Sequence, residues 1–476
     1  MHMHSIRFSK VRHFSSHARV TQQASHILKE ATTHAPSPVV SCTVFPLTSN
    51  STSTATPGSV INADSNLHFY RNKLLDEYVQ KDTTPITLRQ LLFYERQLNT
   101  DRLLKSANYV RQELPVRISH RIREFQNLPF IVGTNPHIQS VYDIYWQAFE
   151  RLRKVPPIRT LEDNDNFCIK LIESLESHMV AIPNLVLGIS ECEQHIDSDR
   201  IDRFMHATLR SRVSRRVLAE QHLALSQQLK RILSSSTTTT TISSPLTTSS
   251  YDHPKALTMS RNKISHDTVF SSCSARDTVS QCVKLARAHS TADNVQSPDV
   301  MIDGQDATFT YIFDHIEYVI YQLLSNSFRH TIATHPQNNL PPIKVTICSN
   351  DADVFFRISD QGGGMSASIY NQLWSYGQRP HARFGNFRNV SQLAARITEH
   401  DQVTVPLGIG LPMSRVYTEY WGGDINIVTM DGWGTDAYVR IPKFGTQLEN
   451  LDFVSVSEEE GREDEGWPMS HRRFVV

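Results

Sequence analysis

The chain has 476 residues, which is enough for two or three domains with cores of their own. Its 48 Lys and Arg residues balance its 48 Asp and Glu residues, so no global field favours nucleic acid or a membrane surface as a partner. No stretch of about 18 apolar residues occurs, so no membrane-spanning helix is predicted. Six scattered cysteines without a C-x-x-C pair argue against a zinc site or a disulfide framework and favour a reducing compartment.

Residues 1–35 have the composition of a mitochondrial transit peptide. No acidic residue precedes Glu30, and Arg7, Arg12 and Arg19 are interspersed with apolar residues. A disordered tail is the alternative interpretation. Residues 36–67 contain a low-complexity run of Ser and Thr and are predicted to be disordered.

Residues 68–233 are predicted to form a helical bundle with a regulatory or docking role, because apolar residues recur there at helical spacings. The first group is Leu91, Leu92, Phe93, Tyr109, Val110, Leu114, Ile118 and Ile122, and the second is Phe167, Leu171, Ile172 and Leu175. Leu209, Val213 and Val217 form a third stripe at four-residue steps. Four arginines would cover the other face of that helix, either solvated or as a docking surface for an anionic partner. They are Arg210, Arg212, Arg215 and Arg216.

Residues 234–256 form a Ser/Thr-rich linker, and the pattern changes in residues 257–445. Short β-branched or aromatic runs predict two β-hairpins, and helices are expected over residues 311–335 and around 412–421. The hairpins pair residues 344–348 with 354–358, and residues 425–428 with 437–441. Helix, two strands, glycine turns, helix and two strands describe an α/β sandwich.

The helix over residues 311–335 would bury Ile316, Val319 and Leu323 on one face. A polar row recurs on it at three- and four-residue steps. A solvated face is the plain interpretation of this row, and contact with a metal-bound nucleotide is the other. The row consists of Gln322, Asn326, Arg329 and His330.

Three glycine-bearing turns follow this helix. Glycines let the backbone approach a ligand closely, an aspartate at a strand end can accept from an amine, and amides at a helix N-terminus suit phosphate oxygens. Each turn alone is weak evidence, and none matches a Rossmann or Walker A pattern. The turns are Asp360-Gln-Gly362-Gly363-Gly364 after a strand, Gly408-Ile-Gly410-Leu411-Pro412 before a helix, and Gly432-Trp-Gly434-Thr435 before a strand.

Together and in this order, N-x-x-R, D-x-G-x-G, G-x-G-L and G-T resemble the nucleotide site of the Bergerat-fold ATPases, which include gyrase, MutL and the histidine kinases. The resemblance implies that Asn326 holds Mg²⁺ on the phosphates of ATP and that Asp360 reads adenine. It also implies a pocket lined by Gly362, Gly364, Gly408, Gly410, Leu411 and Thr435.

Three further runs resemble the mitochondrial α-ketoacid dehydrogenase kinases, over roughly residues 68–445. They are Arg111-Gln-Glu-Leu-Pro-Val-Arg117, residues 211–222 and residues 414–423. The resemblance implies a Ser/Thr protein kinase of the mitochondrial matrix that uses MgATP to phosphorylate and inactivate the E1 subunit of a pyruvate or branched-chain complex. It further implies the E2 lipoyl domain as a partner and a possible homodimer. The acidic tail (residues 446–476) is most simply interpreted as solvated, and a contribution of its Trp467 to the lipoyl contact is the alternative.

This sequence departs from the family pattern at one position that carries chemistry. Gln322 stands where the family has its general-base glutamate, and an amide cannot take a proton from serine at neutral pH. Glu317 does not replace it, because on an ideal helix it points about 140° away. An ATP-binding pseudokinase is therefore the alternative function, with a histidine autokinase as a distant third. Arg329 completes the catalytic candidates.

Smaller departures surround this one. Ser325 replaces a family lysine, Arg379 and Pro380 replace a hydroxyl pair, and Pro406 replaces the first lid glycine. His222 resembles a family histidine of the bundle, and a packing role is the preferred interpretation.

Overall fold

The computed structural model describes residues 72–237, 270–291, 296–336, 339–377 and 408–451. The predicted transit peptide, the tail with Trp467 and the substitutions at Arg379, Pro380 and Pro406 lie outside the described residues.

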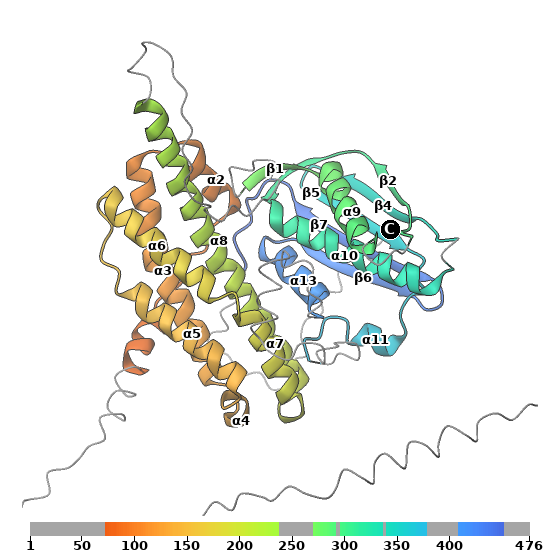
Figure 1. Ribbon diagram of the computed structural model, residues 1–476, viewed down its shortest axis with the longest axis horizontal. Coiled ribbons are helices and arrows are strands. Elements are labelled where there is room, and N and C mark those ends of the chain that lie inside the picture. Colours follow the sequence, from red (N-terminus) through yellow and green to blue (C-terminus); the bar gives the residue numbers. More distant parts are fainter. Residues whose placement is uncertain (1–71, 238–269, 292–295, 337–338, 378–407, 452–476) are drawn as a thin grey trace, which may run out of the picture. The chain divides into compact units, whose positions relative to one another are not determined.

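The N-terminal part is helical, as predicted. Its elements are a helix over 72–79, α2 (Leu88–Arg96), α3 (Thr100–Gln126), α4 (Phe130–Gly133), α5 (Pro136–Arg153), α6 (Leu161–Ser177), α7 (Ala181–Cys192), the 3₁₀ turn Glu193–His195 and α8 (Ser198–Thr237). Helices α3, α5, α6 and α8 pack against one another (Figure 1). Local signals set their starts: Thr160 and Asp163 form a capping box on α6, and Asn135 caps α5 ahead of Pro136.

The bundle core follows most of the predicted stripes. Leu209, Val213 and Val217 are all buried on α8. Two residues break the prediction: Phe93 is 53% exposed and Ile172 is 43% exposed. Ile172 follows buried Leu171 by one residue, which places it about 100° round α6. Phe93 instead lies beneath the Arg102 guanidinium, 4.7 Å from its ring centroid.

The C-terminal part is the predicted α/β sandwich. Its elements are β1 (Phe270–Ser274), α9 (Ala275–Thr291), β2 (Val300–Gly304), β3 (Thr308–Ile312), α10 (Phe313–Thr334), β4 (Ile343–Ser349), β5 (Asp353–Asp360), α11 (Ala367–Asn371), α13 (Gly410–Tyr420), β6 (Asp424–Met430) and β7 (Gly434–Pro442). The main sheet has the order β2-β4-β5-β7-β6, and only the β2–β4 pair is parallel. Both predicted hairpins, β4–β5 and β6–β7, are confirmed, while β2 and the separate β1–β3 pair were not predicted.

One face of the main sheet is buried beneath α10 and α13 (Figure 1). Alternation along β5 buries Val354, Phe356 and Ile358, and helix α10 packs on this strand. Strand β3 runs directly into α10, since β3 ends at Ile312 and α10 begins at Phe313. This arrangement sets the end of β5 beside α10.

A buried ion network joins the bundle to the sandwich. Arg117 of α3 is fully buried and donates to both carboxylate oxygens of Glu449, at 2.9 and 2.6 Å, and to Glu113 at 2.9 Å. The Tyr420 hydroxyl at the end of α13 donates to the same Glu449 carboxylate. Burial acts to lower the pKa of Arg117, but Glu449 raises it above the ordinary value. We call this network the junction.

Helix α8 meets the sandwich along a second line of contacts. The carboxylate of Asp202 accepts from the backbone N–H of Tyr376 at 2.6 Å, and the Glu419 carboxylate accepts from Arg210 at 3.2 Å. The contacting residues of α8 recur at four-residue steps and so share one helix face. Asp202, His206 and Arg210 contact the sandwich, and Ser214, the next residue of the row, accepts from Arg117 of the junction.

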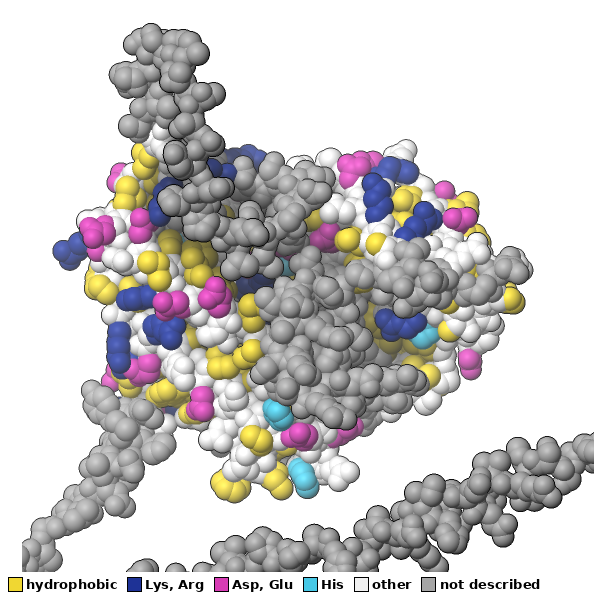
Figure 2. Space-filling model, in the orientation of Figure 1, with side chains coloured by type: hydrophobic (Ala, Val, Ile, Leu, Met, Phe, Trp, Pro, Cys, Tyr) yellow, Lys and Arg dark blue, Asp and Glu magenta, His cyan; other side chains and the backbone are white. Residues whose placement is uncertain are grey.

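The described surface mixes charges of both signs. On the face in Figure 2, lysines and arginines alternate with aspartates and glutamates, in keeping with the balanced composition. Among the described helices, none is both long and apolar enough to cross a membrane.

Candidate active site

Helix α10 presents two of the predicted site residues one turn apart. Ile316, Val319 and Leu323 anchor the helix in the core, as predicted, while Gln322 and Asn326 are half-buried on its polar side. The Asn326 side chain has no hydrogen-bond partner among the described residues. An amide held half-buried without a protein partner has its oxygen and its N–H groups free for a ligand.

Asp360, the last residue of β5, is held from three elements. Its Oδ2 accepts from the Ser327 hydroxyl of α10 at 2.7 Å. Its Oδ1 accepts from the backbone N–H of Gly362 at 2.9 Å and from that of Thr435 at 3.3 Å. All three donors are neutral, so the carboxylate is oriented without being paired to a cation.

The first and third glycine turns close around Asp360 because they lack side chains. A Cβ on Gly362 would lie 2.8 Å from His330 Cβ of α10. A Cβ on Gly434 would lie 2.0 Å from the Asp360 carbonyl oxygen. Gly364 has a φ of +68° and lies against the backbone of Met430 in the β6–β7 turn. These glycines let α10, β5 and β7 approach one another at the site.

The second glycine turn meets α10 about two turns earlier, at Gln322. Gly410 is the first residue of α13, and a Cβ on it would lie 2.5 Å from Gln322 Oε1. Gly408 takes a left-handed φ of +72°, and Leu411 is half-buried in the first turn of α13. The free backbone N–H groups at this helix start suit anionic oxygens. Gln322 is thus beside the second glycine turn.

Three other residues of α10 lie outside the site. Arg329 is exposed on α10, and its electrostatic interaction is with Tyr321. Glu317 accepts from Gln281 of α9 at 3.0 Å and so points away from Gln322. The Ser325 hydroxyl, which stands in place of a family lysine, is hydrogen-bonded to Tyr321.

The residues present fit a nucleotide-bound magnesium ion better than a metal held by protein alone. Among the described residues there is no group of three or more His, Cys, Asp or Glu side chains that could hold a metal. Magnesium is commonly bound by one or two protein oxygens together with substrate phosphates and water. The free amide of Asn326 matches that need.

Ser327 is a site residue that the sequence pattern did not single out. It is 5% exposed and donates to Asp360, yet it lies one residue after Asn326 and therefore off the polar row. A serine within a buried helix face was the available signal, since a buried hydroxyl needs a partner.

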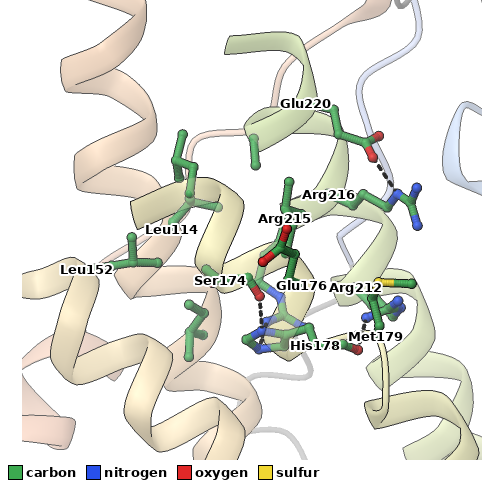
Figure 3. Close-up of a pocket in the computed structure, with 14 residues that line it drawn as sticks. Leu114, Leu152, Ser174, Glu176, His178, Met179, Arg212, Arg215, Arg216 and Glu220 are labelled. Carbon is green, nitrogen blue, oxygen red and sulfur yellow. Dashed lines mark hydrogen bonds and ion pairs between the residues drawn. The ribbon is translucent and has the colours of Figure 1, made fainter. Parts of the chain in front are cut away.

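The bundle contains a separate cavity of about 160 Å³ whose lining is mainly apolar and also includes three arginines, two glutamates and His178. Figure 3 shows Arg212 and Arg215 of α8 beside His178, and Arg216 of the same helix paired with Glu220. Burial lowers the pKa of Arg212 to about 10 and that of His178 to about 3. The solvated interpretation of this arginine face is wrong.

His222 has a packing role, in agreement with the prediction. It is fully buried, its Nδ1 lies 3.2 Å from Ser106 Oγ and its Nε2 lies 2.9 Å from Asn164 Oδ1. Burial lowers its pKa to about 4, so the ring is neutral at physiological pH.

Comparison with known proteins covers both parts of the chain. Residues 85–251 match the family model of the mitochondrial branched-chain alpha-ketoacid dehydrogenase kinase, and residues 312–444 match that of the histidine kinase-, DNA gyrase B- and HSP90-like ATPases. The chain is 26% identical to pyruvate dehydrogenase (acetyl-transferring) kinase 2, mitochondrial, of Saccharomyces cerevisiae, over 82% of this chain and 88% of that protein.

Two further relatives carry similar names. The mitochondrial pyruvate dehydrogenase (acetyl-transferring) kinase of Arabidopsis thaliana is 28% identical over 77% of this chain and 93% of its own length. The mitochondrial pyruvate dehydrogenase (acetyl-transferring) kinase isozyme 4 of Rattus norvegicus is 26% identical over 79% of this chain and 85% of its own length. The similarity therefore spans the helical part and the α/β part together.

Proposed function

We propose that this chain, a member of the mitochondrial α-ketoacid dehydrogenase kinases within the Bergerat-fold ATPase superfamily, uses MgATP to phosphorylate and inactivate the E1 subunit of such a dehydrogenase complex. The pyruvate and branched-chain complexes are both candidate targets. The proposed acceptor is a serine hydroxyl.

One observation carries the proposal. Asp360 is held by neutral donors beside α10, the Gly410 helix start meets α10 at Gln322, and the unpartnered amide of Asn326 lies on α10 itself. MgATP needs three contacts: an acceptor for its adenine amine, an oxygen for the cation, and free N–H groups for its phosphates. This agreement supports Asp360 as the adenine-reading residue and Asn326 as the Mg²⁺ ligand.

The remaining site residues take roles consistent with phosphoryl transfer. The transition state of this reaction is loose, so catalysis rests on positioning and charge more than on covalent chemistry. We propose that Gly408, Gly410 and Leu411 form the phosphate side of the pocket, and that Gly362, Gly364 and Thr435 form the adenine side. Arg329, exposed on α10, is proposed as a cation that meets the acceptor protein.

The glutamine at position 322 is the reason for two alternative proposals, an active kinase and a regulator without catalytic activity. Its amide lies against Gly410, where it can orient a serine hydroxyl but cannot accept the proton. The alternative proposal is an ATP-binding pseudokinase that controls the same complex.

The test uses the purified chain, MgATP and the E1 subunit of each complex. The parent, Gln322→Glu and Asn326→Ala are assayed for phosphoserine on E1 and, separately, for MgATP binding by titration calorimetry. A restored base is expected to raise transfer by on the order of 100-fold. Asn326→Ala is expected to lose transfer and the magnesium dependence of binding.

Three outcomes separate the proposals. Phosphoserine from the parent above the Asn326→Ala background supports the kinase. Nucleotide binding without transfer, together with a gain in Gln322→Glu, supports the pseudokinase. A parent that neither binds nor transfers contradicts the site assignment itself.

We also propose a mitochondrial matrix location, the E2 lipoyl domain as a partner and a homodimer. The mitochondrial relatives support the location. The exposed Val428, Trp433 and Tyr438 on β6, β7 and their turn support a contact with a second copy. Sedimentation of the parent beside Val428→Asp tests the dimer: a monomeric parent contradicts it, and a dimer that dissociates on substitution supports it.

A further inference from the structure

Ser327 is the only side chain for which a hydrogen bond to Asp360 is seen among the described residues, the other two donors being backbone N–H groups. Its hydroxyl donates to Oδ2 over 2.7 Å, and the side chain is 5% exposed, so its geometry is fixed by the packing of α10 on β5. No ion pair of Asp360 competes with this bond in the described part of the chain.

Counting acceptor positions shows which oxygen of Asp360 remains open. A carboxylate offers about four lone-pair positions, two on each oxygen. Gly362 and Thr435 fill both positions on Oδ1. Ser327 fills one position on Oδ2 and leaves the other open. The open position therefore adjoins the Ser327 oxygen.

The Ser327 oxygen adds acceptors of its own. Because the hydroxyl hydrogen of Ser327 is donated to Asp360, the Ser327 oxygen can act toward a ligand only as an acceptor. Oδ2 and Oγ thus form a pair of neighbouring acceptors, 2.7 Å apart. A 6-amino group, which has two hydrogens, suits such a pair, whereas a 6-oxo group places an acceptor against acceptors.

We propose that Ser327 is the positioning residue that makes Asp360 select 6-amino purines over 6-oxo purines. The proposal rests on the proposed function, which makes Asp360 the adenine-reading residue. Without the Ser327 hydroxyl, Oδ2 would keep its charge but lose the bond that orients it. Selectivity is expected to suffer more than nucleotide binding as a whole.

The experiment measures dissociation constants of ATP and of inosine triphosphate, both with magnesium, by calorimetry on the full chain. The two nucleotides differ at position 6 of the purine, where inosine carries an oxo group. Variants are Ser327→Ala and the near-isosteric Ser327→Cys, whose thiol is a weak donor. In both, ATP affinity is expected to fall about tenfold, the size of one hydrogen bond to a charged group, with inosine triphosphate affinity unchanged.

Thr331→Val is the matched control. Thr331 lies one turn further along the same helix, is fully buried, and has a hydroxyl with no partner among the described residues. Valine preserves its shape, so this variant removes a buried hydroxyl of α10 without touching Asp360. Its ratio of the two dissociation constants is expected to equal that of the parent.

Several results would overturn the proposal. An equal loss for both nucleotides would mean that Ser327 supports only the fold, and a loss in Ser327→Ala absent from Ser327→Cys would trace the effect to a cavity. If the ratio of the two dissociation constants changed as much in Thr331→Val, the selectivity would not depend specifically on Ser327. A parent that binds ATP while both Ser327 variants match it contradicts this inference alone, whereas a parent that binds neither nucleotide contradicts the proposed function as well.

Discussion

Glu449 at the junction accepts from the guanidinium of Arg117, from Tyr420 and from the backbone N–H of Ile86, whereas Asp360 at the site accepts from neutral groups alone. Glu449 is 4% exposed, and its charge is balanced within the protein. Asp360 is half-buried and retains an open acceptor position. The carboxylate that ties two parts of the chain together is paired with a cation, whereas the carboxylate proposed to read adenine is oriented by neutral donors alone.

The strongest test of this contrast removes the cation of the junction. Arg117→Met leaves Glu449 and Glu113 without their shared partner in a buried setting. The free energy of unfolding is expected to fall by about 3–5 kcal/mol, as measured by urea denaturation. The double variant with Glu449→Leu is expected to recover part of the loss. A single variant as stable as the parent would show that the junction carries little stability.

A second test makes the same change, carboxylate to amide, in both regions. Glu449→Gln puts an amide opposite Arg117 and is expected to cost about 2–4 kcal/mol in unfolding free energy. Asp360→Asn is expected to cost less than about 1 kcal/mol, because its oxygen can accept from Gly362 and Thr435 while its nitrogen donates to the Ser327 oxygen. The effects on ATP binding are expected in the reverse order: Asp360→Asn should weaken binding more than Glu449→Gln does. Equal stability losses would erase the distinction between the two carboxylates.

A third test compares two glycines of the site. Gly434→Ala would bring a Cβ to 2.0 Å from a backbone oxygen of β5, so the strands must shift, and a loss of about 1–3 kcal/mol with weaker ATP binding is expected. Gly410→Ala meets the end of the flexible Gln322 side chain and is expected to cost less than about 1 kcal/mol. Thermal unfolding measures both. Comparable losses would mean that α13 is held as rigidly as the strands.

A fourth test uses pH to probe the bundle side of the contrast. Burial lowers the pKa of His222 to about 4 from its ordinary value of 6.5, so the unfolded chain binds this proton more readily. The stability that neutral His222 provides is complete above about pH 6.5 and is lost as the pH falls toward 4, by about 1.4 kcal/mol per pH unit. His222→Gln is expected to reduce the difference in unfolding free energy between pH 6.5 and 5.5 by about that amount. If this difference in unfolding free energy is unchanged in the variant, groups other than His222 cause the acid sensitivity.

Local pattern was enough to predict the parts of the fold that depend on near neighbours. The buried stripe of Leu209, Val213 and Val217, both hairpins and the polar side of α10 all follow from periodicities of 3.6 or 2 residues. The position of Asp360 at a strand end was likewise visible, because the D-x-G-x-G turn follows directly after an apolar run.

What could not be predicted depends on contacts between distant segments. The bond between Ser327 and Asp360 joins residues 33 apart, and that between Arg117 and Glu449 joins residues 332 apart. Nothing in the spacing of α8 indicated that Arg215 would be buried against Tyr145 instead of meeting water. Partner choice for a polar side chain is set by tertiary packing, which periodicity alone does not encode.

The line of contacts along α8 limits how this chain can change in length. Asp202, His206, Arg210 and Ser214 all face the sandwich or the junction, and they do so at four-residue steps within a single unbroken helix. One residue inserted between His206 and Arg210 would turn one half of the row about 100° away from its partners. Whole-turn insertions would keep the direction but slide the contacts along the axis by about 5 Å. Helix α8 can therefore accept substitutions far more readily than insertions or deletions.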